Sequence, residues 1–168
     1  MKRISIASLI LCIVCAVAAP KLYADSMFFG LGAAANANTR QGVAAGGAFS
    51  FGIDVNRHLA IGYKTAYSND FDTMSVIERA ALIRWYIPLQ TRGLFMQAEL
   101  GSSVFFENGE SYPAFLSGAA LGWRFSLGGN MFIEPTVRGG YPFVWGAGIT
   151  AGFSFPISPG AVRNEQGE

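Results

Sequence analysis

The residues that could perform acid–base or nucleophilic chemistry are few. The chain has a single histidine, His58, and the nearest acid before it is Asp54, which could orient it. A histidine held by a carboxylate can act as a general base, but it needs a hydroxyl or thiol nucleophile within hydrogen-bond reach. No serine lies in the short segment around His58, and both cysteines, Cys12 and Cys15, lie in an apolar N-terminal segment. The sequence therefore predicts no catalytic residues and no enzymatic activity.

Signals for metals, cofactors and nucleic acids are equally weak. One histidine and no cysteine after residue 24 leave only carboxylates as metal ligands, so we expect no metal site. The stretch GLGAAAN at 30–36 has the glycines of a nucleotide loop, but no helix follows it, and we expect no cofactor. After residue 24, nine Lys and Arg stand against eleven Asp and Glu, a net charge of −2 without a basic cluster, which argues against nucleic acid as a partner.

The remaining charged residues lie within apolar segments that alternate with a period of two. Lys64 shares one face of its segment with Gly62, while Ile61 and Tyr63 occupy the other face. This alternation is typical of β-strands, in which successive side chains point to opposite faces. The same reasoning places eight polar side chains on the faces opposite the large apolar ones: Lys64, Glu78, Arg84, Gln97, Glu99, Arg124, Glu134 and Arg138.

Eight such segments are separated by clusters of Asn, Asp, Gly, Pro and Ser. We expect strands at about 27–36, 43–55, 58–68, 75–87, 93–106, 114–127, 130–140 and 143–156. Most of them reach the roughly 9 to 11 residues with which a tilted strand crosses a bilayer. Strands of soluble sheets are usually shorter, about 5 or 6 residues. The sequence therefore predicts an all-β protein, an eight-stranded antiparallel up-and-down transmembrane β-barrel.

The connections between the predicted strands fall into two classes. Tight connections follow the second, fourth and sixth strands, at 56–57, 88–92 and 128–129. Longer polar loops follow the first, third and fifth strands, at 37–42, 69–74 and 107–113. This asymmetry is typical of outer-membrane barrels whose termini both lie on the periplasmic side. We expect the three polar loops to face outward and to be where an environmental or host ligand binds. Pro135, inside the seventh strand, predicts a bulge or a local defect in pairing.

Aromatic residues cluster near both ends of the predicted strands, on the apolar faces. In FVWGAGITAGFSFP, residues 143–156, one face is aromatic at both ends and aliphatic between, while the other face is small or polar. Amphipathic rings favour the two membrane interfaces. We therefore expect two lipid-facing belts formed by Phe29, Phe51, Tyr67, Trp85, Phe106, Trp123, Phe125, Phe143, Trp145, Phe153 and Phe155. The lean faces and the eight polar residues then share an interior only wide enough for side chains, where the charges must be paired as a structural polar core.

The N-terminal segment predicts export. A basic start at 1–3 precedes an uncharged apolar run at 4–19, which is the layout of a secretory signal peptide. Ala24 is the preferred cleavage position and Ala18 the alternative, and an uncleaved membrane anchor is the competing interpretation. The expected organisation is a signal peptide at 1–24, an outer-membrane barrel at 25–157 and a short polar tail at 158–168.

By these patterns the mature region resembles the small eight-stranded outer-membrane proteins of the OmpA membrane domain, OmpX and OmpW kind. The segment GITAGFSF, with Gly152, Phe153 and Phe155, is similar to the terminal strand signal of that group. The resemblance implies two partners, outer-membrane lipid and the barrel assembly machinery, the latter through the strand at 150–155. Members of the group usually stop at the aromatic residue, whereas PISPGAVRNEQGE follows here.

Three functions are compatible with the sequence. The first is a non-enzymatic surface barrel with a structural role or a role in contact with the environment or a host. The second, implied by the resemblance to OmpW-like proteins, is a narrow channel for small, including hydrophobic, molecules, although a charged interior argues against an apolar conduit. The third is a soluble exported β-barrel that binds a lipid-like ligand, which would place Trp85, Trp123 and Trp145 inside and the charges outside.

Overall fold

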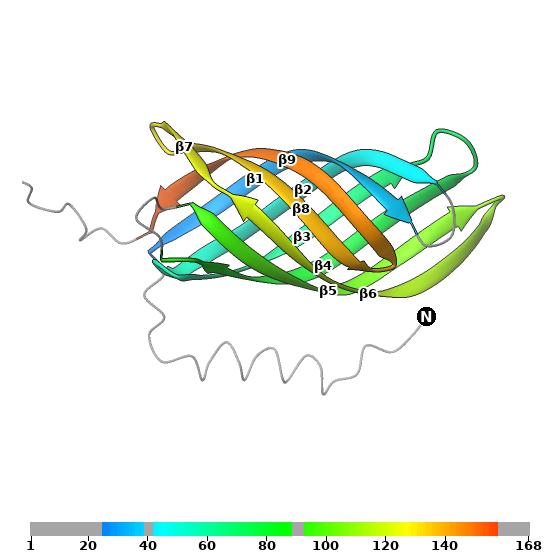
Figure 1. Ribbon diagram of the computed structural model, residues 1–168, viewed down its shortest axis with the longest axis horizontal. Helices are drawn as coiled ribbons and strands as arrows, with labels where there is room; N and C mark the ends of the chain where they lie inside the picture. Colours follow the sequence, from blue (N-terminus) through cyan, green and yellow to red (C-terminus); the bar gives the residue numbers. More distant parts are fainter. Residues whose placement is uncertain (1–24, 39–41, 89–92, 158–168) are drawn as a thin grey trace, which may run out of the picture.

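The described part of the chain forms one antiparallel sheet closed into a barrel (Figure 1). The computed structural model describes residues 25–38, 42–88 and 93–157. Its strands are β1 (Ser26–Asn38), β2 (Val43–Asn56), β3 (Leu59–Asn69), β4 (Met74–Tyr86), β5 (Leu94–Glu107), β6 (Glu110–Trp123), β7 (Phe125–Gly128), β8 (Met131–Tyr141) and β9 (Phe143–Pro156). Because β7 continues β6 after a break at Arg124, the barrel has eight strands. In the described ranges, no helix is long and apolar enough to cross a membrane.

Two non-consecutive pairings close the barrel. β1 pairs with β9 along its whole length, from Ser26↔Pro156 to Asn38↔Phe143. β6 pairs with β8 across the break that β7 leaves in chain order. All other neighbours follow the chain, so the predicted up-and-down topology is confirmed. β1 begins and β9 ends at the same end of the barrel, at the left of Figure 1, which we call the terminus end; the opposite end is the loop end.

The strand boundaries match the predicted ones within a few residues, except at the predicted 107–113 loop. That prediction is wrong, because β5 and β6 are joined by a two-residue turn, and Glu107 pairs with Glu110. Asn108 and Gly109 have φ angles of 52° and 84°. Asn-Gly turns with two positive φ angles match the twist of paired strands, so they let the strands continue up to the turn. The result is a long hairpin that projects at the loop end (Figure 1).

The other two predicted loops are short in the structure. β1 ends at Asn38 and β2 begins at Val43, and residues 39–41 between them lie outside the described residues. β3 and β4 are joined by residues 70–73. The predicted signal peptide and C-terminal tail also lie outside the described residues.

Pro135 interrupts the sheet as predicted. β6 and β8 pair from Ser117↔Tyr141 to Gly122↔Thr136, and pairing resumes at Phe125↔Ile133. In this register Pro135 faces the gap in the ladder, because proline has no backbone N–H to donate. On its other side β8 stays paired with β9 through this point. The gap explains why β6 and β7 are separate segments of one strand.

Apolar and charged side chains together fill the interior. Near the loop end lies an apolar cluster, which we call the loop-end plug, made of Met74, Val76, Ala80, Phe105, Leu116 and Phe143. Near the terminus end lies a second apolar cluster made of Phe28, Ala60, Leu82 and Phe132, with Tyr86 packed against it. The charged residues alternate with these apolar ones: on the inward face of β4, Glu78 lies between Val76 and Ala80, and Arg84 lies between Leu82 and Tyr86. Most of the large apolar side chains that remain exposed lie on the outer wall, whereas Phe71 lies in the loop between β3 and β4.

Candidate functional site in the barrel interior

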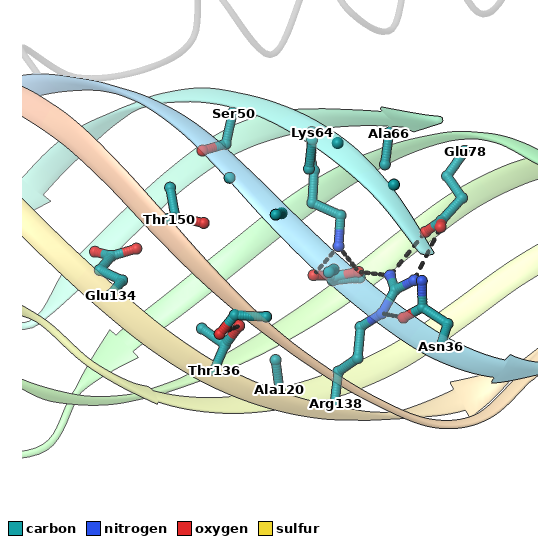
Figure 2. A pocket seen from close by; sticks show the side chains of 18 of the residues that line it. Asn36, Ser50, Lys64, Ala66, Glu78, Ala120, Glu134, Thr136, Arg138 and Thr150 are labelled. Carbon is teal, nitrogen blue, oxygen red and sulfur yellow. Dashed lines mark hydrogen bonds and ion pairs between the residues drawn. The ribbon is translucent and has the colours of Figure 1, made fainter. Parts of the chain in front are cut away.

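Two groups of charged side chains occupy the middle of the barrel, and the first lies nearer the loop end (Figure 2). In this loop-side cluster, Lys64 Nζ donates to both carboxylate oxygens of Glu99, at 2.7 Å each. Arg138 donates to both oxygens of Glu78, at 2.7 and 2.9 Å, and contacts Glu99 Oε2 at 3.4 Å. Arg138 Nε also donates to the side-chain oxygen of Asn36 at 2.8 Å. The cluster therefore ties five strands together across the interior.

The second group, the terminus-side cluster, is centred on Glu134 of β8. Arg84 donates to both oxygens of Glu134, at 2.7 and 3.1 Å. Arg124 Nε donates to the same carboxylate at 2.5 Å, and Arg124 Nη1 lies 3.7 Å from the carboxylate of Asp54. Asp54 also accepts from the Tyr86 hydroxyl at 3.3 Å. One carboxylate thus holds two guanidinium groups, and a second acid balances the charge.

Gln97 joins the two clusters. Its side-chain oxygen accepts from Arg84 Nε and Nη2, at 3.0 and 2.9 Å. Its side-chain nitrogen donates to Glu99 Oε1 at 2.7 Å. The structure therefore brings all eight polar residues singled out in the sequence into one continuous hydrogen-bonded network.

Aromatic rings support the arginines of the terminus-side cluster. The guanidinium carbon of Arg84 lies 3.9 Å from the ring centre of Phe95. That of Arg124 lies 4.2 Å from the ring centre of Phe132, and both guanidinium groups lie near Phe28, at 5.2 and 5.0 Å. A cation over an aromatic face gains about 0.5–2 kcal/mol, more where water is excluded. The aromatic rings at this end therefore stabilise the guanidinium groups directly, in addition to excluding water.

The charges balance within each cluster, with two cations and two acids in each. Burying ions is costly, and the attraction within a pair repays that cost only where hydrogen bonds satisfy both groups. Here Glu78, Glu99 and Glu134 each accept at least two hydrogen bonds. The arrangement can act as a rigid cross-brace. In the described ranges, no group of His, Cys, Asp and Glu side chains is placed to hold a metal ion.

A cavity of about 70 Å³ remains beside the loop-side cluster (Figure 2). Lys64, Glu78 and Arg138 form its charged side. Its other side is lined by small residues of β1, β2, β3 and β9, among them Gly32, Ala34, Gly46, Ala48, Ala66 and Gly148. Ser68 Oγ, which also lines it, is buried without a protein partner. A polar space of this size has room for a few ordered water molecules.

A wider hollow of about 500 Å³ opens at the terminus end and includes His58 in its lining. The backbone N–H of His58 donates to the side-chain oxygen of Asn56 at 2.8 Å, which fixes the turn between β2 and β3. The hydrogen bonds of Asp54 run to Ser26 Oγ, at 2.5 Å, and to Tyr86, and not to His58. The structure therefore does not assemble a histidine–carboxylate pair at this position.

Most of the aromatic residues predicted for the interfaces lie on the outer wall. Nine are exposed, namely Phe29, Phe51, Tyr67, Trp85, Phe106, Phe125, Trp145, Phe153 and Phe155. Trp123 is half-buried and stacks on the ring of Phe125, with ring centres 5.9 Å apart. The outward position of the tryptophans and the inward position of the charges are the reverse of what a soluble lipid carrier requires.

Phe143 is the exception, and its predicted place on the outer wall is wrong. It is only 3% exposed and lies in the loop-end plug, with the guanidinium carbon of Arg138 4.3 Å from its ring centre. β1 pairs Ala37 with Trp145 but Asn38 with Phe143, so Val144 is an extra residue in β9. A bulge of this kind shifts the in–out alternation by one position.

Several residues of the interior network are not among the eight polar residues predicted from the sequence, and Asp54 is predicted only as a neighbour of His58. Asn36 and Asp54 occupy inward positions of β1 and β2, and the alternation that identified Lys64 would have found them. The cation–aromatic contacts of Phe28 could also have been suspected, since Phe28 alternates with glycines on a lean face. The sequence of a single strand does not indicate which acid pairs with which base, because the pairing depends on the register between strands.

No protein family and no characterised protein sequence matches this chain. Solved structures match in fold. The N-terminal β-barrel domain of OprF from Pseudomonas aeruginosa gives a TM-score of 0.58 at 16% identity, over 79% of this chain and 98% of that one. Neisserial surface protein A gives 0.55 at 11% identity, over 78% and 96%. OprG from Pseudomonas aeruginosa gives 0.53 at 8% identity, over 80% and 97%. The chain thus has the fold of small eight-stranded outer-membrane barrels, and the predicted resemblance is confirmed.

Proposed function

We propose that this protein is a small integral outer-membrane β-barrel with a closed interior, that it is not an enzyme, and that it acts as a structural component and through the surface at its loop end. The shared fold supports this proposal, as does an outer wall that is apolar with aromatic residues toward both ends. In this placement the terminus end faces the periplasm and the loop end faces the environment.

The filled interior is the observation that carries the proposal. A solute crossing the barrel would have to pass the loop-end plug and then separate the Lys64–Glu99 and Arg138–Glu78 pairs. Leaving one buried partner of such a pair alone costs about 3–5 kcal/mol. The 70 Å³ cavity favours the alternative of a narrow channel, but it lies against the charged cluster. An interior closed in this way supports a structural role in the membrane better than it supports transport of a solute.

The loop between β3 and β4 supports a contact role for the loop end. Phe71 is 82% exposed and has a φ angle of 66°, which is unusual for a bulky residue. The side chains of Asn69 and Asp70 hold this loop by accepting from backbone N–H groups, those of Phe71, Asp72 and Met74. A fixed loop that presents an aromatic ring to solvent suits binding to an environmental or host ligand.

Single-channel recording in planar bilayers tests the closed interior. The wild-type protein is expected to give no steady current. A channel would instead give small, regular steps whose size changes in Glu99→Ala or Arg124→Ala, and that result would overturn the proposal. Asp72→Asn, a substitution in the exposed β3–β4 loop, serves as the matched control and should behave as wild type.

Cysteine labelling on intact cells tests location and orientation. Both cysteines, Cys12 and Cys15, lie in the predicted signal peptide, so after removal of that segment a single introduced thiol reports its own position. A membrane-impermeant maleimide is expected to label Phe71→Cys on intact cells and Arg57→Cys, in the β2–β3 turn, only after the outer membrane is permeabilised. The reverse pattern would invert the orientation. Release of unlabelled protein by osmotic shock without detergent would exclude membrane insertion.

A further inference from the structure

Arg79 is a charged residue on the outer wall of the barrel. It is exposed, it is the sixth residue of β4, and it lies between Ile77 and Ala81 on the outward face of that strand. Across the described ranges, every other charged side chain lies in the interior or at a strand end or connection. Within those ranges Arg79 also has no hydrogen-bond or ion-pair partner. Its charge is therefore uncompensated by the described part of the chain.

On the outer wall, an arginine side chain without a partner is energetically unfavourable. On the lipid-facing wall of a barrel, an arginine costs about 2–4 kcal/mol at the bilayer midplane and about 0–1 kcal/mol near the interfaces. In the register, Tyr67 pairs with Ile77, which places Arg79 one outward position further into the wall than this aromatic residue. Trp85 lies six residues away, toward the terminus end. Arg79 is thus on the loop-end half of the wall, and its long side chain can reach the nearer interface.

The residues beside Arg79 are also polar. It pairs with Thr65 of β3 and Ser102 of β5, so these two hydroxyl side chains share its level on the outer wall. The Thr65 hydroxyl donates to the backbone oxygen of Glu78, at 3.1 Å. Ser102 is exposed and available to donate outward. Arg79 and Ser102 together form a small group of donors within an otherwise apolar surface.

We propose that Arg79, assisted by Ser102, binds the phosphate monoester of an anionic lipid in the leaflet around the loop end; this rests on the membrane placement proposed above. The planar guanidinium presents paired N–H donors that match phosphate oxygens, and such charge-assisted bonds are the strongest of their kind. A second copy of the chain is a poorer partner. The acids on the described exterior, such as Glu107 and Glu110, lie at strand ends and connections, away from the level of Arg79.

Native mass spectrometry of the reconstituted full-length protein tests this inference. Nanodiscs of phosphatidylcholine containing a minor fraction of phosphatidic acid supply the phosphate monoester. The wild-type protein is expected to retain phosphatidic acid in preference to phosphatidylcholine. Arg79→Leu should lower this preference about tenfold, the order expected for loss of a bidentate charge-assisted contact. Ser102→Ala should lower it less, and Arg79→Lys should fall between wild type and Arg79→Leu because lysine lacks the paired donors.

The control is Arg57→Leu, which removes an exposed arginine from the β2–β3 turn at the other end of the barrel. It should leave the lipid preference unchanged. An equal loss in Arg57→Leu and Arg79→Leu, or full retention in Arg79→Leu, would overturn the inference, and so would an Arg79-dependent dimer. Protease protection in the same nanodiscs separates the two proposals: an unprotected protein contradicts membrane insertion itself, whereas a protected protein without lipid preference contradicts only the phosphate site.

Discussion

Opposite walls of this barrel are built in different ways. The inward faces of β4, β5 and β8 carry Glu78, Arg84, Glu99, Glu134 and Arg138, whereas those of β1, β2 and β9 are mostly Gly, Ala, Ser and Thr. The long side chains cross the interior and end close to the lean wall, as Arg138 does at Asn36. The difference shows that the small residues of one wall are what allow the other wall to keep a complete charged network. Neither wall can be altered without consequences for the other.

The largest expected effect on stability comes from removing a charge from the wall formed by β4, β5 and β8. Glu134→Leu removes the carboxylate shared by Arg84 and Arg124 and leaves two buried cations short of partners. The free energy of unfolding should fall by about 3–5 kcal/mol. Urea unfolding in lipid vesicles measures it, with Asp72→Asn as an exposed control. A loss below about 1 kcal/mol, the range of an exposed pair, would show that the cluster is not a brace.

A double-mutant cycle sharpens the role of the loop-side pair. Lys64→Met and Glu99→Leu should each destabilise the barrel, because each leaves its charged partner buried. The double substitution replaces the pair by apolar groups and should lose less than the two single losses together, with a coupling of about 2–3 kcal/mol. Simple additivity of the unfolding free energies would mean that the two groups do not depend on one another.

Two positions that line the 70 Å³ cavity should respond differently to a larger side chain. A Cβ at Gly148 would lie 2.9 Å from the backbone oxygen of Ala33, so Gly148→Val should cost about 1–3 kcal/mol through overpacking. Ala66 faces the 70 Å³ cavity, so Ala66→Val has room and should change stability by less than about 1 kcal/mol. Thermal unfolding in detergent compares the stability of the two variants. Equal losses of stability would mean that the cavity does not have room for the larger side chain at position 66.

A smaller effect on stability is expected from a substitution of Phe71, which lies in the β3–β4 loop and has a positive φ angle. Phe71→Gly should leave stability unchanged or raise it by up to about 1 kcal/mol, since glycine adopts positive φ without steric cost. Because the Phe71 side chain is 82% exposed, the gain should be the same in the wild-type and Ala66→Val backgrounds. Non-additive unfolding free energies would instead connect the loop to the interior.

The smallest effect concerns pH and the same loop. Hydrogen bonds from the backbone N–H groups of Asp72 and Met74 lower the pKa of Asp70 below its ordinary value. A carboxylate with a lowered pKa in the folded state stabilises that state above its ordinary pKa, and the contribution is lost as the pH falls through the lowered value. Asp70→Asn should therefore flatten the acid side of the pH–stability curve slightly. An unchanged curve would show that the loop does not respond to this charge.

The regular part of the structure could be predicted because it depends on one strand at a time. Period-two alternation indicated all eight strands, and it separated interior charges such as Lys64 and Glu134 from the residues of the outer wall. It failed where a local feature changes the alternation, as at Val144, where the bulge turns Phe143 inward. It also failed at 107–113, where polar composition suggested a loop but Asn108-Gly109 allows the strands to continue.

The network could be predicted as a set of residues but not as a set of contacts. Alternation shows that Arg138 points inward, but not that it binds Glu78 of β4 and Asn36 of β1. Those partners are fixed by the register of each strand pair around the whole barrel. Likewise, the positions of the loop-end plug, the two charged clusters and the aromatic rings beside the arginines depend on how far each strand is displaced relative to the next.

The pairing of β1 with β9 along their full length has a consequence for biogenesis. The strand that is translated first finds its second neighbour only when the strand translated last has arrived. Until then β1 and β9 both expose open edges, and the charges of the interior face water without their cross-strand partners. The ring can therefore close only after the whole of β9 is available, so that closure is a late step in folding.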